Sequence, residues 1–377
     1  MEVDTLDAIP VCVPKATALR TGGSTPSTAG STSFDHVLIR VETTGGVVGY
    51  GEVAPHPDWP NSGTQSTVRS VIESKFAPIV EGQRVTHVAR ITEELNRTVA
   101  SQPFARAGVD AALYDAFGIH VDQPTYELLG GPTNIDRSLP LHYTIGIKAP
   151  EEVRKEATAA ASGGFRTFKL KVGADEHSAD CRRVEAVRDA CPDARIRVDA
   201  NGSWSAGESV RAIRELNEAA DGLVFVEQPV AHDDRSGLRH VRKAVEPSVM
   251  ADEGCYTPGD VAALARADAV DAINIKPAKA GGLSGAKRVA ATAAAYNLPC
   301  YIGGMLELNV GAAAAAHFAL ATPERAYPTG LLNADANGSL IEEPAQWNAA
   351  GPTFTVPDEP GMGVTIDADA VERYRVD

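Results

Sequence analysis

From about residue 139 onward the sequence repeats one pattern, in which a short apolar run is followed by an alanine-rich amphipathic stretch of 10 to 17 residues. Short apolar runs are typical of strands buried on both faces, and the amphipathic stretches are typical of helices that cover them. Each run but the last is followed by such a helix, and this order predicts a parallel (β/α) barrel of the TIM type. The eight runs are 139–147, 167–172, 195–199, 222–227, 248–252, 272–276, 298–302 and 327–332.

The first 130 residues lack this repeat and predict a separate α+β domain. Residues 36–43 alternate apolar and polar side chains, Gly45 and Gly46 supply a turn, and residues 47–53 alternate again, which is typical of an antiparallel hairpin. Helical patterns follow at 66–76, 88–100 and 105–120.

The end of the chain also departs from the repeat. Residues 340–377 contain no further strand and helix pair, and we expect them to return to the N-terminal region. The predicted division is therefore an N-terminal α+β domain over 1–130, a barrel over 131–339 and a C-terminal segment over 340–377.

Composition excludes some classes of partner. A net charge of −15 argues against a nucleic-acid surface, which needs clustered lysine and arginine. No apolar run approaches the length of a membrane span, and the first 20 residues lack the pattern of a signal peptide. The five cysteines are odd in number and contain no CxxC pair, which favours a reducing compartment. We therefore expect a cytoplasmic protein with no nucleic-acid or membrane partner.

Polar residues end one apolar run after another. Lys169 and Lys171 end the second run, and residues at later strand ends lie 24 to 31 positions apart, about one βα unit each. Because the carboxyl ends of barrel strands meet at one rim, we expect these side chains to lie together. The later residues are Asp199, Asn201, Glu227, Asp252, Glu253, Lys276 and Glu307.

Three of these residues predict a metal site. Asp199, Glu227 and Asp252 come from neighbouring strands and offer only oxygen, which suits Mg²⁺ and disfavours zinc because no His or Cys lies beside them. A single acidic residue at the start of a loop is usually a solvated helix cap. Three of them in register, with lysines on the flanking strands, favour the metal interpretation.

The lysines predict acid–base chemistry. Lys169 and Lys171 are two residues apart on a strand and therefore point to the same side, into the barrel mouth. Two adjacent ammonium groups disfavour each other's charged form, which favours a neutral amine able to act as a base. On an isolated edge strand such a pair would instead serve to prevent aggregation. Lys276 ends the sixth run, across the ring, so that two amines would flank a substrate held at the metal.

A lysine base beside Mg²⁺ is a known solution to one chemical problem. Removal of a proton α to a carboxylate creates an enolate whose charge needs a metal and cations nearby. A base on each face would permit epimerisation, or proton loss and return in a cycloisomerisation.

These residues resemble the signature of the enolase superfamily, specifically its muconate-lactonizing subgroup. That signature is KxK on the second strand, metal-binding Asp, Glu and Asp on the third to fifth, and Lys on the sixth. The resemblance covers nearly the whole chain. The matching segments are TFKLKVG, RVDANGSW, VFVEQPV, MADEG, INIKPAKAGGL and YIGGMLELNVG in the barrel, and ARAGVDAALYDAFG with YELLGG before it.

The resemblance implies a role for each residue. Asp199, Glu227 and Asp252 would bind Mg²⁺, with Mn²⁺ as an alternative, and Lys171 and Lys276 would be opposed acid/base groups. The N-terminal domain and the C-terminal tail would form a capping domain, whose loops at 21–33 and 55–62 set specificity. Lys169 would adjust the pKa of Lys171 and help to hold the substrate carboxylate. Asn201 and Glu253 would lie behind the residues that contact metal and substrate, and Glu307 would line the pocket.

Sequence features at the last strands bear on the substrate. Dipeptide epimerases of the subgroup are similar but carry Asp-x-Asp at the eighth strand end, where this chain has Asn333 and Asp335. The GG before MLE and the NIKP run resemble N-acylamino-acid racemases and o-succinylbenzoate synthases. No His ends the sixth or seventh strand, which argues against the mandelate-racemase type.

Several functions remain open at this point. The leading hypothesis is an isomerase of a small carboxylate, either a muconate-type cycloisomerase or a racemase or epimerase of an amino-acid derivative. The alternatives are an o-succinylbenzoate synthase-type dehydratase and a non-catalytic paralogue that binds a carboxylate. Residues 21–33, rich in Gly, Ser and Thr, are either a linker or a lid over the site. We also expect a homo-oligomer.

Overall fold

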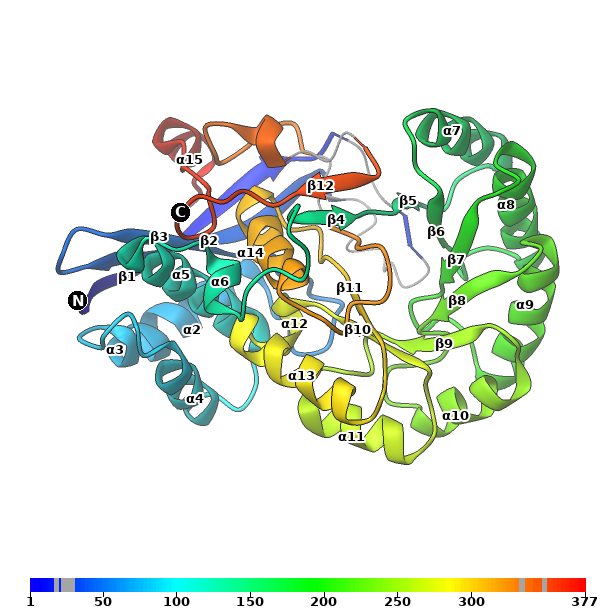
Figure 1. Cartoon of the computed structure of the whole chain (residues 1–377), viewed down its shortest axis with the longest axis horizontal. Coiled ribbons are helices and arrows are strands. Elements are labelled where there is room, and N and C mark those ends of the chain that lie inside the picture. Colours follow the sequence, from blue (N-terminus) through cyan, green and yellow to red (C-terminus); the bar gives the residue numbers. More distant parts are fainter. Residues whose placement is uncertain (17–19, 22–30, 332–335, 348–350) are drawn as a thin grey trace.

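The computed structural model describes residues 1–377 apart from 17–19, 22–30, 332–335 and 348–350. A three-stranded antiparallel sheet occupies one side of the molecule, and a ring of parallel strands wrapped by helices occupies the other (Figure 1). The predicted fold class, a modified (β/α) barrel with an α+β domain, is confirmed.

The antiparallel sheet has the order β1-β2-β3, with β1 at Val3–Pro14, β2 at Ser33–Thr43 and β3 at Val48–Val53. The predicted hairpin is therefore confirmed, with Gly46 in the left-handed region at its turn. The first strand was not predicted, because its alternation is interrupted by the adjacent buried pair Pro10 and Val11 and its partner comes later in the chain.

Helix α5, Pro103–Val121, packs directly on β3. The contact needs glycine, because a Cβ on Gly51 would lie 2.0 Å from the backbone oxygen of Gly108. Smaller helices complete the domain, and the predicted helix at 66–76 is divided into an α and a π segment. These elements are α2 Gln65–Val71, the π-helix Ile72–Phe76, α3 Ala77–Val80, α4 Val88–Thr98 and α6 Thr125–Leu128.

The parallel sheet contains seven strands in chain order, from β5 to β11. Their side chains are buried at nearly every position, as expected for strands covered by helices outside and packed side chains within. The strands are β5 Tyr143–Ile145, β6 Thr167–Lys171, β7 Arg195–Asp199, β8 Leu223–Glu227, β9 Ser248–Ala251, β10 Ala272–Ile275 and β11 Cys300–Ile302.

The prediction of an eighth strand at 327–332 was wrong. The described residues of this range make single bridges instead of a ladder, with Gly330 bonded to Ile302 on one side and Thr329 to Pro140 on the other. Pro140 and Pro328 have no N–H group to donate, so a continuous ladder cannot form here. The first predicted run is divided for a related reason: β4, Ser138–Pro140, leaves the ring and pairs with β12, Thr353–Thr355.

Helices follow the strands and form an arc outside the ring in Figure 1. Two of them begin with capping boxes, Ser205 with Glu208 and Thr257 with Asp260, which satisfy backbone N–H groups at the helix start. These helices are α7 Pro150–Ser162, α8 His177–Ala190, α9 Ala206–Ala219, α10 Arg235–Ala244, α11 Pro258–Arg266, α12 Pro277–Ala280, α13 Leu283–Ala295 and α14 Asn309–Leu320.

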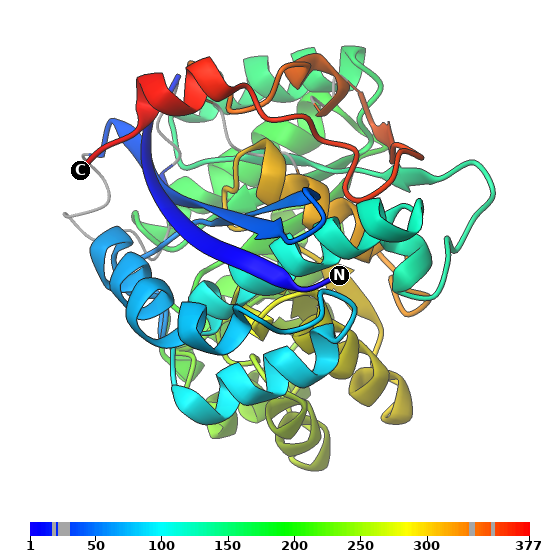
Figure 2. The same cartoon turned by 90° about the vertical axis from the view of Figure 1, so that its left-hand side faces the viewer.

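The last segment of the chain meets the first strand. It contains a 3₁₀ turn at Pro344–Trp347, strand β12 and helix α15, Ala368–Tyr374. Arg375 bridges to Val11, and the Val376 N–H donates to Pro10 O at 3.0 Å. Figure 2 shows this helix beside the far end of β1.

Helix α14 lies between the two parts of the molecule. Every residue from Val310 to Leu320 is buried, and the helix contacts β3, α6 and α13. Despite such apolar segments, no helix in the described ranges is both long and apolar enough to cross a bilayer.

Candidate active site

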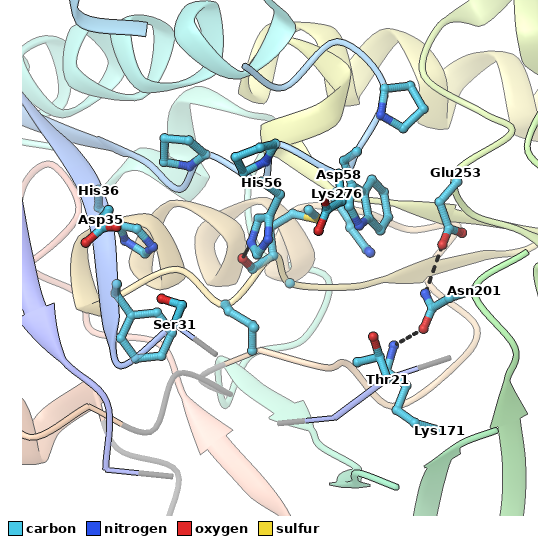
Figure 3. Close-up of a pocket in the computed structure, with 18 of the residues that line it drawn as sticks. Thr21, Ser31, Asp35, His36, His56, Asp58, Lys171, Asn201, Glu253 and Lys276 are labelled. Atoms are coloured by element: carbon cyan, nitrogen blue, oxygen red, sulfur yellow. Dashed lines mark hydrogen bonds between the residues drawn. The ribbon is translucent and has the colours of Figure 1, made fainter. Parts of the chain in front are cut away.

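A cavity of about 700 Å³ opens at the carboxyl ends of the parallel strands, beneath the antiparallel sheet. The barrel contributes Lys169, Lys171 and Lys276 to its wall, and the N-terminal region contributes His56 and Trp59. Figure 3 shows Lys171, Lys276 and His56 around this space. The strand ends and the loops over them therefore enclose one space, as the sequence predicted for the barrel rim.

The three predicted metal-binding carboxylates lie side by side beneath this cavity. Asp199 pairs in register with Glu227 across β7 and β8, and Asp252 follows β9 directly. None of the three side chains is exposed. Buried carboxylates require opposite charges, and four lysines supply them here: Lys169, Lys171, Lys276 and Lys279.

Lys169 bridges two of the carboxylates. Its Nζ donates to Asp199 Oδ2 at 3.2 Å and to Glu227 Oε2 at 3.0 Å, and it lies over the ring of Tyr301. Burial opposes its charge, but Glu227 and its neighbours outweigh burial and raise the pKa of Lys169 well above its usual value. The expectation of a neutral amine is therefore wrong for Lys169, because the adjacent carboxylates outweigh the second ammonium group.

Lys171 begins a row of hydrogen bonds along one side of the cavity. Its Nζ donates to Asp199 Oδ2 at 2.6 Å and to Asn201 Oδ1 at 2.9 Å, and Asn201 Nδ2 donates to Glu253 Oε1 at 2.9 Å (Figure 3). Asn201 adopts a left-handed backbone, which asparagine tolerates better than most residues. The row brings together three residues that the sequence placed on three separate strand ends.

Lys276 approaches from the other part of the ring, directly after β10. Its Nζ donates to Asp252 Oδ2 at 2.7 Å and lies 4.2 Å from the centre of the Trp59 ring. Burial opposes its charge, but Asp252, Glu227 and Glu253 together raise the pKa of Lys276. Trp59 belongs to the predicted specificity loop at 55–62, several of whose residues line the cavity.

Opposing effects set the charge of the carboxylates. Burial disfavours ionisation of Asp199 and Asp252, yet the adjacent lysines outweigh burial and lower the pKa of both. Burial and the neighbouring Asp199 raise the pKa of Glu227. Burial, Asp252 and Asp199 raise the pKa of Glu253 to about 8. The four lysines thus balance the carboxylates in this structure, and a bound cation would take over part of that pairing.

The donor set fits Mg²⁺. Asp199, Glu227 and Asp252 offer carboxylate oxygens on adjacent strands, and within the described ranges no sulfur or imidazole group hydrogen-bonds to them. Hard divalent ions prefer such ligands. The buried Glu253 Oε2 has no hydrogen-bond partner among the described residues, so unsatisfied acceptor capacity remains beside this set.

The other predicted residues have different outcomes. Glu307 is buried, and its Oε2 accepts from Met305 N. It was expected on the pocket wall, but among the described residues its neighbours Gly304, Met305 and Leu306 line the cavity in its place. Asn333 and Asp335 lie outside the described residues. Of the predicted lid at 21–33, Thr21, Ser31 and Ser33 line the cavity, and the intervening positions 22–30 lie outside the described residues.

Sequence reasoning missed two buried partners of the carboxylates. Lys279 Nζ donates to Asp252 Oδ1 at 2.8 Å from helix α12, and Asn274 Nδ2 donates to Glu227 Oε1 at 2.7 Å. A signal for Asn274 was present, because it is two residues before Lys276 and therefore points to the same side of the strand. Lys279 depends on the short helix after Lys276, which the sequence did not reveal.

A buried contact between the two parts of the molecule was also missed. Glu52 on β3 accepts from Leu308 N at 2.7 Å and from Gly311 N at 2.8 Å, at the start of α14, and its Oε1 lies 2.7 Å from His36 Nδ1. Glu52 therefore satisfies the first turn of a barrel helix from the antiparallel sheet.

Known proteins share this architecture. Residues 152–370 match the family model described as enolase C-terminal domain-like, and residues 14–130 match the mandelate racemase / muconate lactonizing enzyme N-terminal domain. The L-Ala-D/L-Glu epimerase of Bacillus subtilis is 33% identical over 95% of this chain and 94% of its own length. Muconate cycloisomerase 1 of Rhodococcus opacus is 33% identical over 92% and 93%.

A solved structure adds a ligand to the comparison. The dipeptide epimerase from Enterococcus faecalis V583, complexed with Mg and the dipeptide L-Leu-L-Tyr, is 29% identical, with a TM-score of 0.88 over 97% of this chain and 100% of that one. Both family models and the full-length similarity agree. The chain belongs to the muconate-lactonizing subgroup of the mandelate racemase and muconate lactonizing enzyme family, within the enolase superfamily.

Proposed function

We propose that this protein is a Mg²⁺-dependent isomerase that removes and returns a proton α to a substrate carboxylate. One observation supports this most directly: Lys171 and Lys276 both line the cavity, and they come from the ends of β6 and β10. Three strands separate these two in the parallel sheet, so the lysines stand on opposite sides of the ring.

Asp199, Glu227 and Asp252 would hold the metal, and Mn²⁺ could replace Mg²⁺. When bound, the ion supplies positive charge that stabilises the electron pair left when the α-proton departs. Lys169 would orient the substrate carboxylate, and Asn201 would hold Lys171 in place through the bond to its Nζ. Trp59 and the loop around it would exclude water from the bound substrate.

Epimerisation or racemisation of an amino-acid derivative is our preferred net reaction. Such a reaction needs one group that removes the proton from one face and a second that delivers a proton to the other. Lys171 and Lys276 meet this requirement. The relatives that act as an L-Ala-D/L-Glu epimerase and an N-succinyl-L-Arg/Lys racemase support the assignment.

Cycloisomerisation of a dicarboxylate is the second candidate. Lys15, at the end of β1, also lines the cavity and offers an ammonium group for a second carboxylate, and the muconate cycloisomerase of Rhodococcus opacus is equally similar in sequence. In that reaction only one lysine must transfer a proton, and the other would contribute charge.

Exchange of the α-proton in D₂O tests the proposal. With Mg²⁺ present, NMR should detect deuterium incorporation into one member of a panel of N-acyl amino acids, dipeptides, proline derivatives and muconate. Lys171→Ala and Lys276→Ala should each abolish racemisation while leaving the chain folded, and Lys287→Ala, on an exposed face of α13, should not.

The outcomes separate the candidates. One-sided exchange in each single variant supports racemisation. A large difference in severity between the two variants, with lactone formed from muconate, supports cycloisomerisation instead. Loss of water from the substrate would indicate a dehydratase. Ligand binding without exchange in the unmodified protein would refute catalysis, and full activity in both lysine variants would refute the mechanism.

A further inference from the structure

Three side chains on the outside of the barrel form a second cluster of metal-binding type. His177 and Cys181 lie on α8, and Glu215 lies on the neighbouring helix α9. Along the described part of the chain, this is the one group of three His, Cys, Asp or Glu side chains whose ligand atoms all lie within 4.8 Å of one another. It shares no residue with the active site.

The distances within the cluster are close to those of ligands around one ion. Cys181 Sγ lies 3.6 Å from His177 Nε2, and His177 Nε2 lies 3.0 Å from Glu215 Oε2. In a tetrahedral zinc site, bonds of about 2.0 Å to nitrogen and oxygen and about 2.3 Å to sulfur place the ligand atoms roughly 3.3 to 3.6 Å apart. Little movement would therefore be needed to accept a cation.

Local structure explains how these ligands meet. A spacing of four residues places His177 and Cys181 one above the other on the same face of α8. Both side chains are half-buried, whereas Glu215 is exposed and can adjust its position. His177 Nδ1 has no hydrogen-bond partner among the described residues, so the ring can carry its proton there and present a lone pair at Nε2.

The ligand types define the class of ion. Thiolate and imidazole favour Zn²⁺ and similar transition-metal ions, in contrast to the oxygen-only active site. We propose that His177, Cys181 and Glu215 form a peripheral site for Zn²⁺ or a similar ion, with water as the fourth ligand.

Binding requires loss of the thiol proton. The Cys181 S–H bond breaks, the proton passes to solvent, and the sulfur bonds to the ion. Burial and the nearby carboxylates, Glu215 first among them, raise the pKa of Cys181 to about 11, so the metal must displace this proton and binding should strengthen with pH.

The proposed site also lies next to the loop that follows β7 and carries Asn201. The His177 ring stands edge-on to Trp204, with ring centres 6.5 Å apart, and Trp204 lies three residues after Asn201. An ion at the cluster would fix the His177 ring and so help to fix the loop that carries Asn201.

Titration with Co²⁺ in the presence of excess Mg²⁺ tests this site. A cobalt–thiolate bond gives a charge-transfer band in the near ultraviolet, and an oxygen-only site gives no such band whichever ion it holds. The native protein should develop this band at one equivalent. Cys181→Ser should abolish it, and Cys191→Ser, at the end of the same helix, should leave it intact.

Two further variants guard against misfolding as an explanation. Glu215→Gln, at an exposed position, should weaken Co²⁺ binding about tenfold, and His177→Ala should weaken it further. Zn²⁺ should raise the melting temperature of the native chain and of Cys191→Ser but not that of Cys181→Ser. The proposal is overturned if the native chain gives no thiolate band, if the band persists in Cys181→Ser, or if it disappears in Cys191→Ser.

Discussion

Buried charged side chains at the barrel mouth persist because each has partners of opposite charge. Asp252 accepts from two lysines, Lys276 and Lys279, and Asp199 accepts from Lys169 and Lys171. Removal of one partner would leave another charge buried and uncompensated. Substitutions here should therefore affect both ligand binding and stability, and the two effects must be measured separately.

Replacement of Glu227 by Gln should weaken metal binding by more than about tenfold, because one of three carboxylate ligands loses its charge. Calorimetric titration with Mn²⁺ measures this directly. Glu307→Gln is the matched control, since Glu307 is also buried at a strand end but bonds to Met305 N. Equal affinity in Glu227→Gln and the native chain would refute the ligand assignment.

Asp115 should make stability depend on pH. It is buried on α5 and accepts from Tyr50 N at 2.8 Å and Met362 N at 2.7 Å, but burial outweighs these bonds and raises its pKa to about 7. Between its unfolded value and about 7 the folded chain binds this proton more tightly than the unfolded chain. The contribution of Asp115 to the free energy of unfolding therefore falls as pH rises through this window and is constant above it.

Asp115→Asn removes this titration. Relative to the native chain, the variant should therefore be more stable at about pH 8 than at about pH 5. The measurement is the free energy of unfolding of the variant minus that of the native chain, from urea denaturation at each pH, and this difference should be larger at about pH 8. Asp122→Asn, at the exposed end of the same helix and in a left-handed conformation that asparagine accepts, is the control. A difference that does not change with pH, or that changes in the opposite direction, would contradict this account.

At the scale of elements, helix α14 depends on a residue from another domain. The first N–H groups of a helix have no partner within it, and Glu52 supplies two acceptors from β3. Gly311 allows Glu307 to pack against the same turn, since a Cβ at position 311 would lie 2.8 Å from the Glu307 side chain.

Glu52→Gln should destabilise the protein by about 1 to 3 kcal/mol, because an amide NH₂ group would face a buried N–H donor. Urea denaturation measures the loss, and Glu42→Gln, on the exposed side of the same sheet, should cost much less. If the two variants lost the same stability, the cap on α14 would not contribute as proposed.

Local pattern was enough to predict the strands that carry the site. The predicted runs 167–172, 195–199 and 222–227 match the observed strands to within a residue, because short buried strands and covering helices have distinct periodicities. The closure of the ring could not be predicted in the same way. It depends on Thr329 and Gly330 meeting Pro140 and Ile302 across long stretches of chain.

At the scale of the whole molecule, the site is assembled from both the barrel and the N-terminal region. The ammonium and carboxylate groups come from the barrel, whereas Trp59, His56 and Lys15 enclose them from the N-terminal region. Burial lowers the pKa of His56 and the hydrogen bond to Met305 raises it. Burial has the larger effect, and the pKa falls to about 4. The neutral ring of His56 can donate to Met305 O at 2.6 Å and so links the loop to the barrel.

Removal of the last helix should loosen the antiparallel sheet and spare the barrel. A chain ending at Asp367 loses α15 and the bond from Val376 N to Pro10 O. Amide hydrogen exchange should become faster along β1, with exchange in β6 to β8 unchanged. Arg373→Ala, at an exposed position of α15, should leave β1 protected. Unchanged protection of β1 in the shortened chain would contradict this prediction.

The pairing of Val11 with Arg375 also has a consequence for synthesis on the ribosome. The first strand emerges from the ribosome long before the residues that cover part of its outer edge. Domains usually fold as they leave the ribosome, from the N-terminus onward. Here the three strands of the N-terminal sheet can pair early, but the outer edge of β1 must wait for Arg375 and Val376, and during that time it can pair with another nascent chain.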